Sequence, residues 1–312
     1  MEPESVITVS ILLGSYNGEH YIRQQLESIR DQIFTDWILY ISDDGSSDGT
    51  LRIIEDFSKT FAKGKVNVFS GPKRGFAANF LSLVRKPEIR STYYAFCDQD
   101  DIWLSDKLES AVNQLTASRS SGKYTLYGSR TVLINDKLEL QGQSPLFSRL
   151  LCLKNALVQS YSGGNTMVFS HSVKLLIEKL PKEIPVVSHD WFLYILVSAL
   201  DGKVIYDRIP KILYRQHSSN MVGSNLSFLA KLQRLKKICS GICQRWNLVN
   251  STALRYYSDV ILPENKKIID LYFVATSSPI ERVRNFISSG VYRQKKHETV
   301  LFLLIAGVNK LN

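Results

Sequence analysis

Apolar residues in the first 120 positions follow two different spacings. Short apolar runs rich in β-branched and aromatic residues at 6–13, 37–42, 66–70 and 93–97 are typical of buried strands. Between these runs, apolar residues recur three or four positions apart over 19–32, 51–61, 76–85 and 107–117, as in amphipathic helices. Strand and helix therefore alternate four times. This order predicts an α/β fold with a Rossmann-like, doubly wound, mostly parallel sheet.

The pattern changes after residue 120. Short strands are expected at 124–129, 132–135, 138–140, 166–169, 204–206 and 212–215, and helices at 172–180 and 189–200. From Leu226 on the chain reads as helical and basic, with Phe228, Leu229, Leu232 and Leu235 near one helix face. We predict a domain over residues 1–225 and a C-terminal helical extension over 226–312.

Charge separates these two regions. The 312 residues carry a net charge of +10, and residues 226–312 contain 14 Lys/Arg against 5 Asp/Glu. A basic amphipathic tail can lie on an anionic membrane, and Val300–Val308 can add a shallow apolar insertion. Alternatively, the tail helices pack back on the first domain and present a solvated basic face. No aromatic residue is interleaved with the basic run Lys231–Lys237, so no nucleic-acid partner is expected.

The N-terminus and the cysteines bear on location. No basic region followed by an apolar run opens the chain, so no secretory signal is expected. Four scattered cysteines without a paired spacing indicate a reducing compartment. These features favour a cytoplasmic protein.

Three carboxylates, Asp98, Asp100 and Asp101, directly follow the apolar run Tyr93–Cys97. Carboxylates held this close repel one another unless a positive partner compensates them. At the carboxyl end of a strand they face the crevice where open α/β sheets bind ligands. Their hard oxygen atoms suit Mg²⁺ or Mn²⁺. The alternative is a loop whose acids cap the helix at 107–117.

The usual nucleotide-binding fingerprints are missing. Neither Gly-x-Gly-x-x-Gly nor Gly-x-x-x-x-Gly-Lys-Ser/Thr occurs in the sequence, which argues against a dinucleotide dehydrogenase and against a P-loop NTPase. A phosphate bound by this chain would therefore need a cation, which again indicates the acidic cluster.

A second acidic stretch, Asp43–Asp48, follows the second strand. For Asp43 and Asp48 we expect an Asx-turn and a helix cap. For Asp44 we expect contact with a ligand, because a carboxylate there can accept a hydrogen bond from a base or a ribose.

Three segments together carry a resemblance. VSILLGSYNG (Val9–Gly18), DDGSSDGT (Asp43–Thr50) and FCDQDDIW (Phe96–Trp103) resemble, in order and spacing, glycosyltransferase family 2 over about residues 5–220. Members are inverting enzymes of GT-A fold that use nucleotide sugars. SHDW at Ser188–Trp191 and YRQH at Tyr214–His217 are most similar to bacterial rhamnosyl- and hexosyltransferases of surface polysaccharide assembly.

The resemblance implies roles on the donor side, within residues 1–120. Ser15 and Tyr16 line the base pocket, Asp44 contacts the base, and Asp98 holds the ribose or the metal. Arg74 and Asn79 border the nucleotide. Gly14 stands where many members carry a larger or hydroxyl residue, so one nucleotide contact is expected to be missing.

Further roles concern the metal and the reaction. Asp100 ligates the metal that bridges the diphosphate, and His217 completes the metal shell in some members; the alternative for a single histidine is a structural role. Asp190 matches the general base, although an acid in the first turn of a helix is also favoured by the helix dipole. His189 is expected to form local hydrogen bonds or to orient Asp190.

The acceptor side is assigned to residues 121–225. Gly164 and Asn165 would let the backbone approach the acceptor, or would form a plain turn between strands. Arg215 would meet the diphosphate or pair with a core acid. Trp191 would pack, or would contact the acceptor.

These roles describe a metal-dependent inverting transferase. It would move a sugar, L-rhamnose or a hexose, from a dTDP-, UDP- or GDP-linked donor to a growing, lipid-linked glycan such as O-antigen or capsule. The protein would sit peripherally on the cytoplasmic face of the inner membrane. The alternative is a non-catalytic binding or scaffold module on the same fold, which would bind neither nucleotide nor metal.

Overall fold

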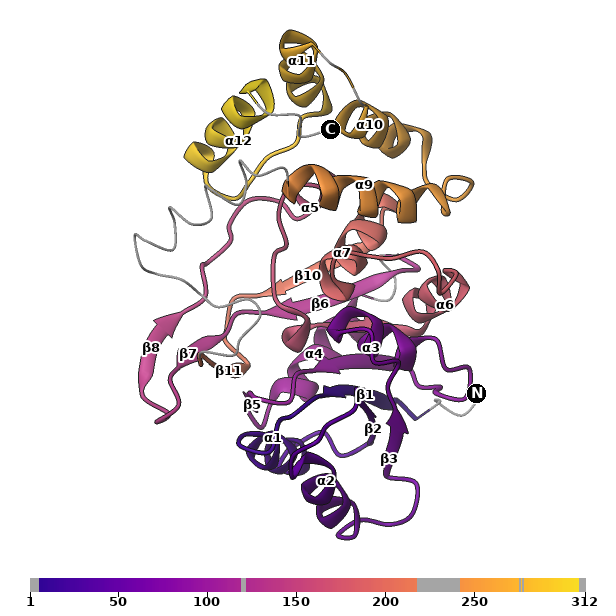
Figure 1. Cartoon of the computed structure of the whole chain (residues 1–312), viewed down its shortest axis with the longest axis vertical. Coiled ribbons are helices and arrows are strands. Elements are labelled where there is room, and N and C mark those ends of the chain that lie inside the picture. Colours follow the sequence, from indigo (N-terminus) through magenta and orange to yellow (C-terminus); the bar gives the residue numbers. More distant parts are fainter. Residues whose placement is uncertain (1–5, 119–121, 218–241, 275, 277, 309–312) are drawn as a thin grey trace. The chain divides into compact units, whose positions relative to one another are not determined.

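The computed structural model describes residues 6–118, 122–217, 242–274, 276 and 278–308 (Figure 1). By backbone contacts the chain divides into two compact units. The first lies within residues 1–146, 162–179 and 203–219, and the second within 147–161, 180–202 and 220–312. Two segments that precede residue 225 therefore belong to the second unit. The domain boundary at residue 225 stays a prediction.

A seven-stranded sheet forms the centre of the first unit, in the order β10-β6-β9-β4-β1-β2-β3. Strands β1 to β4 are parallel to one another, whereas β9 runs antiparallel to both β4 and β6. The mostly parallel sheet predicted from the sequence is therefore confirmed. Its strands are β1 (Val9–Ser15), β2 (Trp37–Asp43), β3 (Val66–Ser70), β4 (Tyr93–Cys97), β6 (Thr125–Ser129), β9 (Val168–Ser170) and β10 (Lys203–Asp207).

Helices cover both faces of this sheet (Figure 1). Alternate residues of β1, β2 and β4 share one buried core with apolar residues of α1, α2 and α4. On the other face Phe80 of α3 meets Phe96 of β4, which in turn meets Phe169 of β9, and α6 packs beside α3. The helices are α1 (Ile22–Arg30), α2 (Thr50–Ser58), α3 (Phe76–Val84), α4 (Lys107–Ala117) and α6 (His171–Lys179).

A second, four-stranded sheet in the order β5-β11-β7-β8 belongs to the same unit. The sequence predicted β11 with its observed bounds but not β5, because a two-residue strand has no detectable period. In β5, Ile102 and Trp103 pair antiparallel with Leu213 and Ile212 of β11. This pairing brings residue 101 next to residues 215–217. The strands are β5 (Ile102–Trp103), β7 (Val132–Ile134), β8 (Leu140–Gln143) and β11 (Ile212–Arg215).

The second unit consists of helices. Helix α5 packs on α7, and α9, α10, α11 and α12 pack each on the next. Trp191 of α7 meets Trp246 of α9 edge to face, with ring centroids 6.0 Å apart. The helices are α5 (Leu153–Ala156), α7 (His189–Ala199), α9 (Ile242–Arg255), α10 (Pro263–Phe273), α11 (Pro279–Ser289) and α12 (Lys296–Val308).

The helical character predicted for the tail is confirmed where the structure describes it, from Ile242 to Val308. The amphipathic segment at Phe228–Leu235 and the basic run Lys231–Lys237 lie outside the described residues. Within the described ranges, no helix combines the length and the apolar character that crossing a bilayer requires.

Candidate functional site

The carboxyl ends of the parallel strands meet at one edge of the large sheet. Ser15 at the end of β1 lies in register with Asp43 of β2, and Asp43 with Ser70 of β3. On the other side of β1, Leu13 pairs with Cys97, the last residue of β4. The turns that follow these strands therefore gather the polar residues of the three resembling segments.

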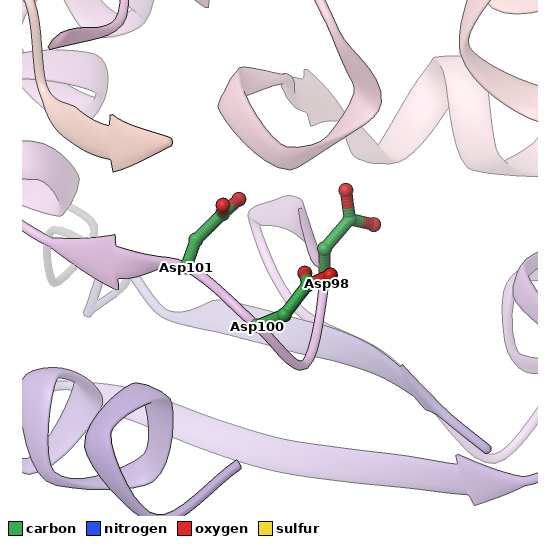
Figure 2. A group of neighbouring side chains, drawn as sticks. All are labelled: Asp98, Asp100 and Asp101. Carbon is green, nitrogen blue, oxygen red and sulfur yellow. The ribbon is translucent and has the colours of Figure 1, made fainter. Parts of the chain in front are cut away.

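The acidic cluster lies on the turn between β4 and β5 (Figure 2). Carboxylate oxygens of Asp98, Asp100 and Asp101 all lie within 4.8 Å of one another. Asp98 and Asp100 are partly exposed, whereas Asp101 is fully buried. The alternative, that these acids cap the following helix, is wrong, since Asp106 occupies the position before α4.

Asp101 differs from its two neighbours. Its Oδ1 accepts the backbone N–H of Arg215 at 3.2 Å, and its Oδ2 accepts the side-chain amide of Asn165 at 2.5 Å. Burial raises the pKa of the Asp101 carboxyl to about 8, and the charge of Asp100 adds to the rise. Because both oxygens accept hydrogen bonds from protein donors, Asp101 joins three chain segments, whereas Asp98 and Asp100 are the partly exposed carboxylates of the cluster.

Asp100 meets His217 across 117 residues of sequence. The imidazole Nε2 lies 2.8 Å from Asp100 Oδ2, so the structure places His217 at the acidic cluster, as the resemblance implies. The His217 ring stacks on Tyr21, with centroids 4.8 Å apart and planes 25° apart. The Tyr21 hydroxyl donates to Asp136 Oδ1 at 2.8 Å. Tyr21, which the sequence did not single out, thus fixes the plane of the imidazole.

Arg215 is turned into the protein. It is 1% exposed, its Nε donates to the backbone carbonyl of Asp100 at 3.0 Å, and its Nη2 donates to Gln24 Oε1 at 2.5 Å. Its charge also lowers the raised pKa of Asp101. These contacts support the backbone of the Asp100 turn, and the expected alternative of pairing with a core acid stays a prediction. Contact of Arg215 with diphosphate or acceptor stays a prediction.

Ser15 is the last residue of β1, and Tyr16 begins the turn that follows it. The Ser15 hydroxyl is buried and donates to Asp43 Oδ2 at 2.8 Å, so it serves the protein in this structure. The Tyr16 ring is 57% exposed and free to meet a base. Asp43 also accepts from the backbone N–H groups of Gly45 and Ser46, which confirms the expected Asx-turn.

Asp48 accepts from the N–H and hydroxyl of Thr50, the first residue of α2, at 3.0 and 2.5 Å. These hydrogen bonds lower the pKa of its carboxyl although desolvation opposes them. Asp48 therefore has a structural role at the start of α2, but it lies one residue before the N-cap, Gly49, rather than at the cap as expected.

Asp44 connects the turns after β2 and β3, and Asn79 connects α3 to β2. The Asp44 carboxylate accepts the backbone N–H of Lys73 at 2.6 Å and of Gly75 at 3.1 Å. The Asn79 amide is buried and donates to the Ser42 carbonyl at 2.8 Å. Arg74, between the two residues that Asp44 holds, is exposed. Contacts of Asp44, Arg74 and Asn79 with a nucleotide stay predictions.

The space above Gly14 is filled by an aromatic ring. A Cβ at Gly14 would lie 3.2 Å from Phe80 Cζ and 3.4 Å from Asn79 Nδ2. A larger side chain at this position would therefore displace Phe80, which gives a packing reason for the departure from the family pattern.

Gly164 and Asn165 open a short 3₁₀ turn at Gly164–Thr166 ahead of β9, and both are buried. The Asn165 amide is committed to Asp101. This backbone agrees with the alternative of a plain turn between strands. The close approach of the backbone to an acceptor stays a prediction.

Asp190 and Trp191 belong to the second unit. Asp190 lies in the first turn of α7, and its Oδ1 accepts from the Ser188 hydroxyl at 2.6 Å and from the Trp191 N–H at 2.7 Å. Burial lowers the pKa of the neighbouring His189 to about 4, against the charge of Asp190. The Trp191 indole N–H donates to the Ala156 carbonyl at 2.7 Å, which agrees with a packing role. A catalytic role of Asp190 stays a prediction.

The donor set at the acidic cluster fits a divalent cation. Two partly exposed carboxylates offer hard oxygen atoms of the kind that Mg²⁺ and Mn²⁺ bind, and His217 adds a nitrogen next to one of them. A cation would also offset the mutual repulsion of Asp98 and Asp100.

A family model decides the classification. The model described as Glycosyl transferase family 2 matches residues 10–176, more than half of the chain. The chain belongs to glycosyl transferase family 2. The match begins in β1 and ends in α6, and apart from Val9 it contains the three segments that carry the resemblance.

Two relatives of this family 2 chain are informative. It is 33% identical over 238 residues to dTDP-rhamnosyl transferase RfbG of Shigella flexneri, a match covering 72% of this chain and 78% of that protein. It is 30% identical over 130 residues to the UDP-Glc:alpha-D-GlcNAc-diphosphoundecaprenol beta-1,3-glucosyltransferase WfgD of Escherichia coli, covering 42% and 48% of the two chains.

Solved structures show the same fold at low identity. S. aureus TarS residues 1–349 superposes with a TM-score of 0.55 at 14% identity, covering 91% of this chain and 89% of that one. The mannosyltransferase PcManGT of Pyrobaculum calidifontis gives a TM-score of 0.50 at 15% identity, covering 99% and 88%. The predicted GT-A fold is confirmed.

Sequence reasoning missed Tyr21 and Gln99 as parts of this site, and it did not foresee that Asp101 is the buried member of the acidic cluster. Tyr21 acts through His217, and Gln99 bonds to the backbone of Tyr16. The two-residue strand that buries Asp101 leaves no periodic signal. The sequence did contain one signal for the burial of Asp101. This acid directly precedes an apolar pair, and an acid in that position can be buried with the pair.

Proposed function

We propose that this family 2 chain is a metal-dependent inverting glycosyltransferase of surface polysaccharide assembly. It transfers L-rhamnose or a hexose from a nucleotide diphosphate sugar to a growing, lipid-linked glycan such as O-antigen or capsule. The observation that carries the proposal is the pairing of Asp100 with His217 inside a carboxylate cluster at the carboxyl edge of the sheet. The relatives support the donor and acceptor classes, because RfbG is a dTDP-rhamnosyl transferase and WfgD transfers glucose from UDP-Glc to a diphosphoundecaprenol-linked sugar.

The donor lies along the turns that follow β1, β2, β3 and β4. The exposed Tyr16 ring offers a face to the base, and the backbone that Asp44 orders at Lys73 and Gly75 borders the nucleotide. Arg74 lies exposed on that same turn and can meet phosphate.

The carboxylates of Asp98 and Asp100, with the His217 imidazole, hold a Mg²⁺ or Mn²⁺ ion. When bound, this ion acts as a Lewis acid for the leaving diphosphate. Arg215 and Asp101 keep the turn in place, since one holds the carbonyl of Asp100 and the other ties the turn to β11.

The Asp190 carboxylate takes the proton from the acceptor hydroxyl as that hydroxyl attacks the anomeric carbon. The attack comes from the face opposite the leaving group, and a single displacement inverts the anomeric configuration. A positioned base contributes about 10²–10⁴-fold to such a step. Ser188 and the Trp191 N–H orient one oxygen of Asp190.

A peripheral position on the cytoplasmic face of the inner membrane completes the proposal. Exposed Lys295 and Lys296 at the start of α12, followed by exposed Val300 and Leu304, support contact with an anionic lipid surface. Co-sedimentation with vesicles that contain an anionic lipid, compared with neutral vesicles, measures this contact.

The test of the activity is turnover of dTDP-rhamnose, UDP-glucose and GDP-mannose with a lipid-linked acceptor, with Mn²⁺ or with EDTA. Transfer that requires the metal and inverts the anomeric configuration is expected. Absence of nucleotide binding and of any metal effect would instead favour a non-catalytic binding module on the same fold.

A further inference from the structure

We propose that Gln99 is a positioning residue that couples donor binding to cation binding. Its side-chain amide joins the turn after β1 to the turn after β4. Gln99 Nε2 donates to the Tyr16 carbonyl at 2.9 Å, and Gln99 Oε1 accepts from the Tyr16 N–H, also at 2.9 Å. Because both polar groups of one residue are used, the two turns cannot slide past each other without breaking a hydrogen bond.

The paired hydrogen bonds extend the sheet past its last residues. Strands β1 and β4 are parallel neighbours whose final backbone pair is Leu13 with Cys97. The backbone pairing ends here, and the Gln99 amide exchanges one donor and one acceptor with the backbone of Tyr16. The side chain therefore adds a connection between the two turns beyond the pairing of the strands.

The position of Gln99 gives this link its consequence. Asp98 and Asp100, the accessible carboxylates, flank Gln99, while Tyr16 presents the exposed ring on the opposite turn. A base that stacks on Tyr16 and a cation that draws Asp98 and Asp100 together act on the two turns that the Gln99 side-chain amide joins. Each ligand should then favour the other, since coupling between two sites is reciprocal. This inference rests on the proposed function, which supplies both ligands.

Gly18 provides room for the link. A Cβ at Gly18 would lie 2.2 Å from Gln99 Oε1 and 2.5 Å from Gln99 Cδ. Gly18 is not among the glycines with a positive φ, so alanine can adopt its backbone conformation. Gly18→Ala should therefore push the flexible end of Gln99 away from Tyr16 while the fold is kept. The sequence thus offers two independent ways to break one contact.

The experiment measures the affinity of dTDP, UDP and GDP by calorimetry, without metal and at saturating Mn²⁺. For the unchanged protein we expect Mn²⁺ to tighten the binding of the accepted nucleotide, within the range of about 5–150-fold that is typical of coupled sites. Gln99→Met keeps the length of the side chain and removes both hydrogen bonds. We expect it to lose most of this Mn²⁺-dependent gain while nucleotide affinity without metal changes little.

Two further variants make the result specific. Gly18→Ala should reproduce the loss, and the double variant Gly18→Ala/Gln99→Met should lose no more than either single one. Asn67→Ala is the matched control, because it removes a side-chain hydrogen bond to the Gly64 carbonyl at the opposite end of β3. This control should leave the coupling unchanged.

Two outcomes separate the inference from the function on which it rests. Nucleotide binding with full Mn²⁺ coupling in Gln99→Met overturns the role of Gln99 and leaves the proposed function intact. Failure of the unchanged protein to bind any of these nucleotides, with or without Mn²⁺, overturns the proposed function and this inference with it.

Discussion

The imidazole of His217 lies 2.8 Å from the carboxylate of Asp100, although 117 residues separate the two in sequence. The small sheet accounts for this approach. Strand β5 directly follows the acidic turn and pairs with β11, and His217 lies two residues beyond the end of β11. The Tyr21 ring stacks on the imidazole of this pair.

Removal of the Asp100 carboxylate should abolish cation binding. For Asp100→Asn we expect at least an approximately 100-fold loss of Mn²⁺ affinity, more than the 10–100-fold typical of second-shell changes. Electron paramagnetic resonance of free Mn²⁺ measures this affinity without reference to turnover. Asp31→Asn, an exposed acid beside Arg30, is the control. Equal Mn²⁺ affinity in Asp100→Asn and the unchanged protein would remove Asp100 from the ligand set.

Tyr21 should act through the orientation of His217. In Tyr21→Leu the imidazole loses its stacking partner, and we expect Mn²⁺ affinity to fall by about 10–100-fold, as for other second-shell changes. Tyr21→Phe keeps the ring and loses only the hydrogen bond to Asp136, so it should retain most of the affinity. If Phe and Leu at this position weaken Mn²⁺ binding equally, the stacking does not position His217.

Lys107 should make stability depend on pH. Its ammonium is buried over the Trp103 ring at 3.6 Å and has no hydrogen-bond partner among the described residues. Burial lowers the pKa of Lys107 from 10.5 to about 7. Between pH 7 and 10.5 the unfolded chain therefore holds a proton that the folded chain has lost. Rising pH then stabilises the folded state over this window, and falling pH removes that gain.

The replacement Lys107→Met tests this pH dependence. Methionine keeps an apolar stem and cannot be protonated, so the variant should be more stable at pH 7 by on the order of 1–4 kcal/mol. Its advantage over the unchanged protein should shrink towards pH 10. Urea unfolding at pH 7, 8.5 and 10 measures the difference, and a constant difference across the three pH values would refute the buried neutral lysine.

Asp190 should affect catalysis far more than folding. Asp190→Asn should lower kcat by about 10²–10⁴-fold if the carboxylate takes the acceptor proton. Donor affinity should stay within about two-fold, because a base contributes to the reaction step rather than to donor binding. Ser188→Ala, which removes only the hydroxyl that orients Asp190, serves as the milder comparison. Full activity in Asp190→Asn would show that Asp190 is not the general base and is only an acid in the first turn of α7.

The large sheet was predictable because its strands are long and apolar. Residues 66–70 and 93–97 match β3 and β4, and the helix expected at 107–117 matches α4. The small sheet was only partly predictable. Its strand β5 has two residues, so no period identifies it, and the pairing that brings Asp101 to Arg215 depends on contacts far apart in sequence.

The sequence identified many residues of the site but not the contacts between them. The sequence indicated that Asp98 and Asp100 face a ligand, and the resemblance placed His217 with them. It could not show that Ser15 is buried against Asp43 or that Arg215 is turned inward, because both depend on where a side chain finds its partner. The relation between Asp190 and the acidic cluster stays a prediction for the same reason.

The most direct test is binding of dTDP, UDP and GDP to the purified protein, each with and without Mn²⁺. We predict that one of these nucleotides binds, that Mn²⁺ strengthens its binding, and that Asp100→Asn removes the effect of Mn²⁺. Nucleotide affinities that do not respond to Mn²⁺, or that respond equally in Asp100→Asn, would contradict the metal-dependent donor site.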